Sequence, residues 1–164
     1  VVLDAFERLQ SDHPDLALVL VGKEGWLVDQ LVQRLRHHPL RGERVLWLGG
    51  VDDAQLAWLY DHAFVAVAPS IYEGLGVPVM EALHHGCPTI SSTGGAQPEA
   101  GGGLSELFDP LDVDELVALL RRHLDDPGHH ATARAAAVAH RGPTWADTAA
   151  AVAASVRDLA QVVS

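Results

Sequence analysis

Two glutamates separated by seven residues, Glu73 and Glu81, are the side chains of this sequence best placed to do chemistry. They belong to the stretch PSIYEGLGVPVMEA, residues 69–82. An ionised carboxylate can accept two hydroxyl hydrogen bonds at once, which suits a vicinal diol. One glutamate could therefore hold a ribose and the other a hexose. The alternative is that both are solvated surface carboxylates.

The residues between the two glutamates are suited to an anion. Gly74 and Gly76 lack a Cβ, so the backbone can come close to a ligand. Pro78 is expected at the first position of a helix, with Glu81 on its first turn. The amides of residues 75–77 then precede a helix N-terminus, where free N–H groups and the helix dipole favour negative charge. A pyrophosphate would suit this place, although a simple tight turn would also explain the glycines.

The elements that must position this stretch are read from hydrophobic periodicity. Short apolar runs predict strands at residues 16–21, 44–48, 64–68, 88–91 and 106–108. Segments of helical period lie between them and after residue 112. This alternation predicts an α/β fold, a Rossmann-like parallel sheet with helices on both faces. The run 16–21 is almost wholly aliphatic, which is typical of a strand covered on both sides.

The predicted sheet places the two glutamates at a binding edge. Residues 69–77 leave the carboxyl end of the strand 64–68, and open parallel sheets bind ligands at that edge. No linker interrupts the chain, so residues 1–164 are predicted to form a single domain. The four tryptophans fall on apolar stripes, and we expect them in the core.

Composition narrows the function classes. The formal net charge is -11 and there is no basic stripe, so a nucleic-acid partner is not expected. The single cysteine, Cys87, cannot form an internal disulfide and suits a reducing compartment, so we expect a cytoplasmic protein. Ten histidines include adjacent pairs, but neighbours on a helix point to different faces, and no local spacing is typical of a chelate. We therefore expect no metal site.

The stretch 69–82 resembles the E-x7-E signature of a large family of retaining glycosyltransferases, the glycosyl transferases group 1, which includes sucrose synthase and bacterial mannosyl- and glucosyltransferases. Further segments resemble the same family in the same order: 18–22, 47–53, 59–63, 86–90, 99–100 and 108–110. The resemblance implies a GT-B architecture, in which two Rossmann-like domains enclose a cleft. This chain would be the C-terminal domain, which holds the nucleotide-sugar donor.

The resemblance also implies roles for individual residues. Glu81 would hold the ribose hydroxyls and Glu73 would contact the transferred sugar. The backbone that would face the sugar and phosphates belongs to Gly74, Leu75, Gly76 and Val77. Two of these depart mildly from the family pattern, since Leu75 replaces a usual Phe and Val77 a usual Leu.

Two further residues complete the predicted donor site. Val51, in the loop 50–52, would lie beside the base through main-chain contacts, although it could equally be a packing residue. Lys23 follows the strand 16–21 and could approach a phosphate, although a solvated loop lysine is the plainer interpretation. The run 22–26 resembles bacterial mannosyltransferases of polysaccharide synthesis, which makes GDP-mannose the first donor to consider.

The implied function is donor binding for retaining hexosyl transfer to a glycan or lipid-linked acceptor, with no cofactor or metal. Three alternatives stay open at this point. The chain could be a non-catalytic nucleotide-sugar-binding domain, a nucleotide-sugar epimerase of GT-B architecture, or an unrelated flavodoxin-like module.

The family pattern also implies that a strand is absent. Residues 1–10 match its first helix, so the first strand, the Arg and Lys that follow it and the N-terminal acceptor domain would lie upstream of Val1. That strand would be central, between 16–21 and 64–68. We expect the two edges to close on each other or to be completed in a strand-swapped homo-oligomer. We expect the isolated chain to be inactive, and the missing N-terminal domain could attach the protein peripherally to a membrane.

Overall fold

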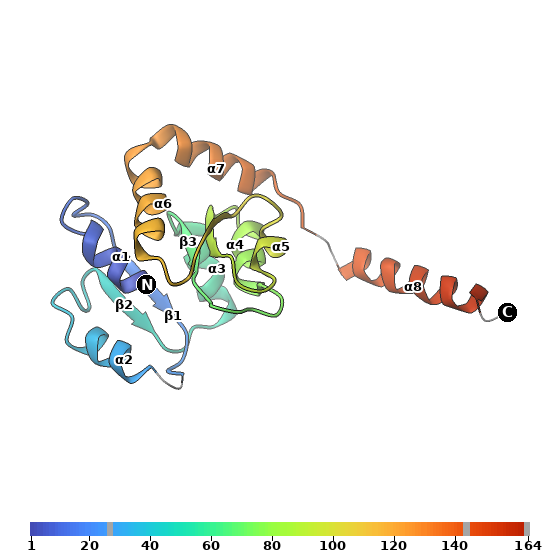
Figure 1. Ribbon diagram of the computed structural model, residues 1–164, viewed down its shortest axis with the longest axis horizontal. Helices are drawn as coiled ribbons and strands as arrows, with labels where there is room; N and C mark the ends of the chain where they lie inside the picture. The colour runs from blue at the N-terminus through green and yellow to red at the C-terminus, as the bar shows by residue number, and fades with distance from the viewer. Residues whose placement is uncertain (26–27, 143–144, 163–164) are drawn as a thin grey trace.

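Strands and helices alternate along most of the chain. The structure, a computed structural model, describes residues 1–25, 28–142 and 145–162 (Figure 1). The elements in order are α1 (Val2–Leu9), β1 (Leu18–Val21), α2 (Asp29–Arg36), β2 (Val45–Leu48), α3 (Asp53–His62), β3 (Ala66–Ala68), α4 (Val77–His84), β4 (Thr89–Ser92), α5 (Gln97–Gly101), β5 (Glu106–Phe108), α6 (Val113–Asp125), α7 (Pro127–Ala139) and α8 (Trp145–Val162). The predicted α/β fold is confirmed. The predicted start of α2 at Trp26 lies outside the described residues.

The parallel strands form two separate sheets rather than one. β1 pairs with β2, with Leu18 opposite Val45, and the second sheet has the order β3-β4-β5. In the part of the chain that the structure describes, no ladder joins β1 to β3. The prediction that these two edges close on each other is therefore wrong. Completion by a second copy of the chain stays a prediction.

The split leaves β1 half covered. Leu18 and Leu20 pack with α1 and α2 on one face of the small sheet. Val19 and Val21 point to the other face and are 38% and 44% exposed. The prediction that this strand is covered on both faces is wrong. The strand that is covered on both faces is β4. Its four residues are all buried, between α4 and α5 on one side and α1 and α6 on the other.

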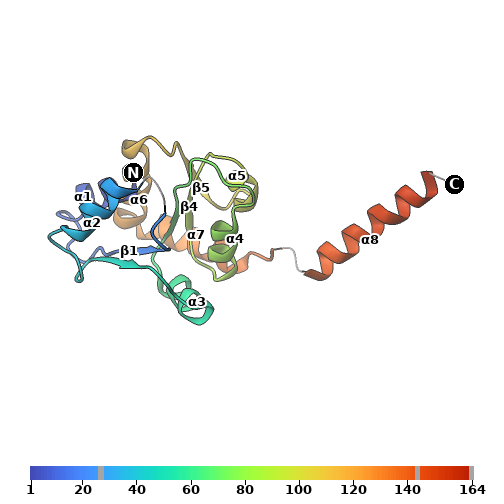
Figure 2. The same ribbon diagram turned by 90° about the horizontal axis from the view of Figure 1, so that it is seen from below.

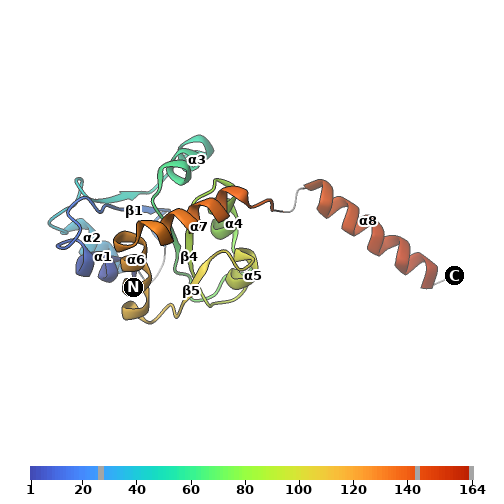
Figure 3. The ribbon, with the colours of Figure 1, turned by 90° about the horizontal axis from the view of Figure 1, so that it is seen from above.

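Helix α1 belongs to two hydrophobic cores. Leu3 and Phe6 pack against the β1-β2 sheet and α2. Ala5 and Leu9 pack with Ile90, Phe108 and the buried leucines of α6. α1 and α6 accordingly lie side by side, and an ion pair between Arg8 and Asp114 joins them (Figures 1 and 3). This helix therefore connects the two sheets that share no backbone hydrogen bonds, which explains why β1 and β3 can stay apart.

Helices α3 and α8 pack little against the rest. None of the residues of α3 is buried, and the helix stands out from the fold (Figures 2 and 3). Trp58 on α3 is 57% exposed, so its assignment to the core is wrong. α8 extends away from the other elements, and its residues 146–158 are exposed (Figure 1). Among the described residues, no helix combines the length and the apolar character that crossing a bilayer requires.

The start of α4 is shaped by contact with α5. Gly76 is the N-cap residue with φ +73°, a left-handed conformation that L side chains rarely adopt. A Cβ at this position would lie 2.6 Å from the Cβ of Ala100. Gly76 is thus required by the packing of two helices. Helix α4 begins at Val77, so Pro78 is its second residue rather than its first.

We expect Gly76→Ala to destabilise the protein and Gly74→Ala to leave its stability almost unchanged. The first substitution meets both a positive φ and Ala100, which should cost about 1–3 kcal/mol. A Cβ at Gly74 would meet nothing within 4 Å, so its effect should stay within about 0.5 kcal/mol. Urea unfolding measures both values, and equal effects would contradict this account of the loop.

Candidate functional site

The loop that carries Glu73 leaves the carboxyl end of β3 and is held by two buried polar side chains. The amide of Gln97 donates to the carbonyl of Ser70 at 3.0 Å and to the hydroxyl of Ser92 at 2.9 Å. The Ser92 hydroxyl also donates to the Ser70 carbonyl. Neither Ser92 nor Gln97 is among the site residues predicted from the sequence. The available signal was a polar residue ending a buried strand, followed by two glycines.

Gly94 and Gly95 contact the Glu73 loop directly. A Cβ on Gly94 would lie 2.0 Å from the carbonyl oxygen of Ile71, and one on Gly95 would lie 2.3 Å from that of Glu73. The next amide, of Ala96, donates to the same Glu73 carbonyl at 2.9 Å. The backbone of Glu73 is therefore fixed from the β4–α5 connection, and no other residue type would fit at positions 94 and 95 without moving the loop.

The loop ends in a row of free backbone donors. No described residue accepts a hydrogen bond from the N–H groups of residues 74–77. The N–H groups of Val79 and Met80 are already bonded to the carbonyl of Gly76, at 3.0 and 3.2 Å. Four consecutive donors that lead into the N-terminus of an eight-residue helix are chemically suited to an anion, because the helix dipole also favours negative charge there.

Gly74 and Gly76 have different surroundings. The space beside Gly74 is open, which fits the expectation that its backbone can approach a ligand. The space beside Gly76 is filled by α5, so the missing Cβ there serves packing. Leu75 and Val77 are exposed, at 61% and 43%, whereas Gly76 between them is buried.

Glu81 is held by a tyrosine that sequence analysis did not single out. The hydroxyl of Tyr60 on α3 donates to Oε2 of Glu81 at 3.2 Å. Burial, and then the neighbouring Glu81, raise the pKa of Tyr60, so this group stays a neutral donor. The ring of His85 stacks on Tyr60 with centroids 5.7 Å apart, and Nδ1 of His85 lies 2.9 Å from a carboxylate oxygen of Asp61. The carboxylate of Glu81 is thereby oriented, and no described residue bonds its second oxygen.

The two glutamates bracket the row of donors. Glu73 precedes the row, is half-buried, and its carboxylate has no hydrogen-bond or ion-pair partner among the described residues. Glu81 is the fifth residue of α4, so it lies on the second turn of the helix. The prediction that it lies on the first turn is wrong. One helical turn, about 5.4 Å along the axis, therefore separates it from the donors at the helix start. A ligand spanning the row could meet a carboxylate at either end.

Val51 lies at an open hollow of about 470 Å³ beyond the carboxyl end of β2. The hollow is lined by Trp47, Leu48, Gly49, Gly50, Val51, Gln55, Trp58 and Leu59. Asp52 shapes this loop as the cap of α3: its carboxylate accepts from the backbone N–H of Gln55 at 2.8 Å, and its own backbone N–H donates to Oε1 of Gln55 at 3.0 Å. Neither Glu73 nor Glu81 lines the hollow.

Lys23 follows β1 at the same edge of the small sheet. The N–H of Gly22 donates to the carbonyl of Leu48 at 3.0 Å, and the Gly22 carbonyl accepts from the Trp47 indole at 2.9 Å. Lys23 therefore lies near the Val51 loop, exposed and without an ion-pair partner in the described ranges. The structure records no contact between Lys23 and residues 74–77, which follow a strand of the other sheet.

The chain is similar to several curated bacterial glycosyltransferases. It is 39% identical over 144 residues to O-antigen chain mannosyltransferase B of Escherichia coli, a match covering 84% of this chain and 37% of that protein. Glycogen synthase of Mycobacterium tuberculosis H37Rv is 36% identical over 128 residues, which cover 75% of this chain and 30% of that protein. The chain therefore spans well under half the length of these relatives.

Solved structures share the fold. The C-terminal domain of the glycosyl transferase group 1 protein LpcC from Francisella tularensis superposes with a TM-score of 0.69 at 18% identity, covering 83% of this chain and 73% of that one. The Anabaena protein HepE, solved with UDP-glucose, gives a TM-score of 0.67 at 22% identity, covering 82% and 37%. The family model "Glycosyl transferases group 1" matches residues 1–140. On this match across most of its length, the chain belongs to the glycosyl transferases group 1 family.

Proposed function

We propose that this chain binds the nucleotide-sugar donor of a retaining hexosyltransferase, with the diphosphate on the free N–H groups of residues 74–77. The observation that carries the proposal is this row of four unbonded donors at the start of α4. A diphosphate is the anion for which such a row is suited, because its oxygens accept several hydrogen bonds at once. Glu73 and Glu81 at the two ends of the row would then select the sugar and the ribose.

The donor that we propose is GDP-mannose. Support comes from the relatives, which include mannosyltransferases of Escherichia coli and a 28% identical Mycolicibacterium smegmatis protein named as GDP-mannose-dependent. The base would lie at the hollow beside Val51, and Lys23 at the same sheet edge would approach a phosphate. The acceptor would be a glycan or lipid-linked glycan bound by a separate N-terminal domain.

In the proposed reaction the bond from C1 of the hexose to the diphosphate breaks, and the diphosphate takes the electron pair. The acceptor hydroxyl forms the new bond to C1 with retention, and its proton passes to the oxygen of the leaving diphosphate. Backbone donors aimed at the leaving diphosphate stabilise the charge that develops on it, an electrostatic contribution that needs no metal at this place. Glu73 and Glu81 position the donor and do not attack it.

A non-catalytic nucleotide-sugar-binding domain is the second candidate. The observation that favours it is that no hydrogen bond or ion pair joins a described lysine or arginine to residues 74–77, and Lys23, the one cation proposed for the phosphates, follows a strand of the other sheet. Sugar transfer by the protein that contains this chain separates the two candidates.

Glu81→Ala should lower nucleotide affinity at least tenfold in the protein that contains this chain. It removes charge-assisted hydrogen bonds to the ribose worth about 1.5–3 kcal/mol each. Titration calorimetry with GDP measures the loss. The control is Glu43→Ala, which removes the same charge from an exposed position before β2, at the amino edge of the β1-β2 sheet. Unchanged affinity for the Glu81 variant would refute the ribose assignment.

Glu73→Gln should impair transfer while sparing GDP binding. The carboxylate is expected to meet the hexose and not the nucleotide, so its loss acts on the reacting sugar alone. Steady-state rates with GDP-mannose and calorimetry with GDP test the two halves. Parallel losses in both measurements would mean that the roles of the two glutamates are wrongly divided.

Tyr60→Phe should weaken GDP binding between about twofold and tenfold, since one hydrogen bond contributes about 0.5–1.5 kcal/mol. Because Tyr60 acts through Glu81, the substitution should have no further effect in a Glu81→Ala background. A double-mutant cycle measures this coupling. Additive losses would show that Tyr60 does not work by orienting Glu81.

A further inference from the structure

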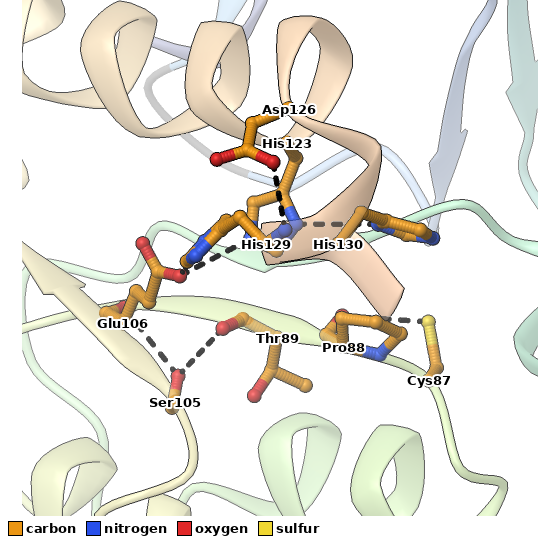
Figure 4. Close-up of polar contacts among 9 residues, drawn as sticks. All are labelled: Cys87, Pro88, Thr89, Ser105, Glu106, His123, Asp126, His129 and His130. Atoms are coloured by element: carbon orange, nitrogen blue, oxygen red, sulfur yellow. Dashed lines mark hydrogen bonds and ion pairs between the residues drawn. The ribbon is translucent and has the colours of Figure 1, made fainter. Parts of the chain in front are cut away.

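Three histidines and a glutamate gather where β5 meets the corner between α6 and α7 (Figure 4). Glu106 is the first residue of β5, His123 lies on the last turn of α6, and His129 and His130 lie on the first turn of α7. Nε2 of His129 is 2.6 Å and Nε2 of His123 is 3.4 Å from the same oxygen, Oε1 of Glu106. One ligand atom from each of these three residues lies within 4.8 Å of the other two.

Two buried atoms of this cluster lack hydrogen-bond partners. His123 has a side chain only 1% exposed, and its Nε2 atom makes no hydrogen bond. Oε2 of Glu106 is buried and unbonded as well. Each buried polar atom without a partner costs about 1–3 kcal/mol, so a group that bonds both would be stabilising.

We propose that Glu106, His123 and His129 form a site for a divalent transition metal, for which Zn²⁺ is the best match. Two imidazoles and a carboxylate are a ligand set that zinc takes, with a fourth position left for water. Bonds of about 2.0–2.1 Å in a tetrahedron place ligand atoms about 3.3 Å apart. The His123–Glu106 separation is already 3.4 Å, and the His129–Glu106 pair would open by less than 1 Å as the metal replaces the proton between them.

The surroundings hold these ligands in place. Nδ1 of His123 lies 3.2 Å from Nδ1 of His130, whose ring stacks on Phe64 with centroids 3.8 Å apart. Asp126 caps α7 by accepting from the amide of His129 at 2.9 Å (Figure 4). Outer contacts of this kind orient metal-binding histidines. The side chain of His129 is 16% exposed, which gives an ion a way in.

The position indicates a structural role. Glu106 begins β5, and Phe64 precedes β3, so the site lies at the amino edge of the β3-β4-β5 sheet. Residues 74–77 follow the carboxyl edge of that sheet. A metal here would clamp the α6–α7 corner to β5 and would not touch the donor. The expectation of no metal rested on local spacing, whereas these ligands come from three elements.

The test is zinc binding by the purified protein after dialysis against a chelator. Titration with ZnCl₂ should show one tight site per chain, and the melting temperature should rise on zinc addition. Glu106→Gln and His129→Gln should each weaken binding at least about 100-fold, since even outer-shell partners are worth about 10- to 100-fold. The matched control is His84→Gln, which removes an exposed histidine of α4 and should bind zinc like the unaltered protein.

A visible spectrum after loading with Co²⁺ gives a second readout that does not depend on stability. Tetrahedral absorption should appear in the unaltered protein and in the His84 variant, and be absent in the other two. Circular dichroism of the metal-free variants checks that both are folded. Weak binding at several sites, or tight binding that survives both Glu106→Gln and His129→Gln, would overturn the proposal.

Discussion

Helix α1 packs into two hydrophobic cores at once, and the arrangement of the whole molecule depends on this contact. The β1-β2 sheet and the β3-β4-β5 sheet share no backbone hydrogen bonds in the described residues. Leu3 and Phe6 bury one side of the helix against the first sheet, while Ala5 and Leu9 bury the other against the second and α6. Burying an apolar side chain of this size stabilises by about 1.5–3 kcal/mol. Side-chain packing therefore joins the two sheets here, whereas backbone hydrogen bonds between neighbouring strands join them in an unbroken parallel sheet.

This arrangement divides the proposed donor site between the two sheets. Val51 and Lys23 follow strands of the small sheet, whereas Glu73 and the free amides follow β3. Tyr60 on α3 donates to Glu81, which joins this second part of the site to the helix that follows β2. The distance between the base end and the phosphate end of the site is consequently set by α1 and α3, and not by strand pairing.

Within the larger sheet, the two edges carry different features. At the carboxyl edge, Ser92, Gln97 and the paired glycines hold the Glu73 loop so that its amides stay free. At the amino edge, Glu106 meets histidines from the α6–α7 corner. The first arrangement leaves donors unpaired for an anion, and the second leaves buried acceptors unpaired for a cation. Both are places where the protein alone does not satisfy its polar groups, which is where ligands are expected.

The sequence by itself determined the α/β fold, the strands to within about two residues, and the glutamate–glycine stretch with its family. These depend on local periodicity, on turn residues and on a contiguous motif. The tertiary structure alone decided that β1 is exposed on one face, that Gly76 serves packing against Ala100, and that Trp58 is exposed. It also decided which partners Glu81 and Glu106 have. Tyr60 and His123 are 21 and 17 positions away from these glutamates, and no local pattern encodes a contact that only the folding of separate elements brings about.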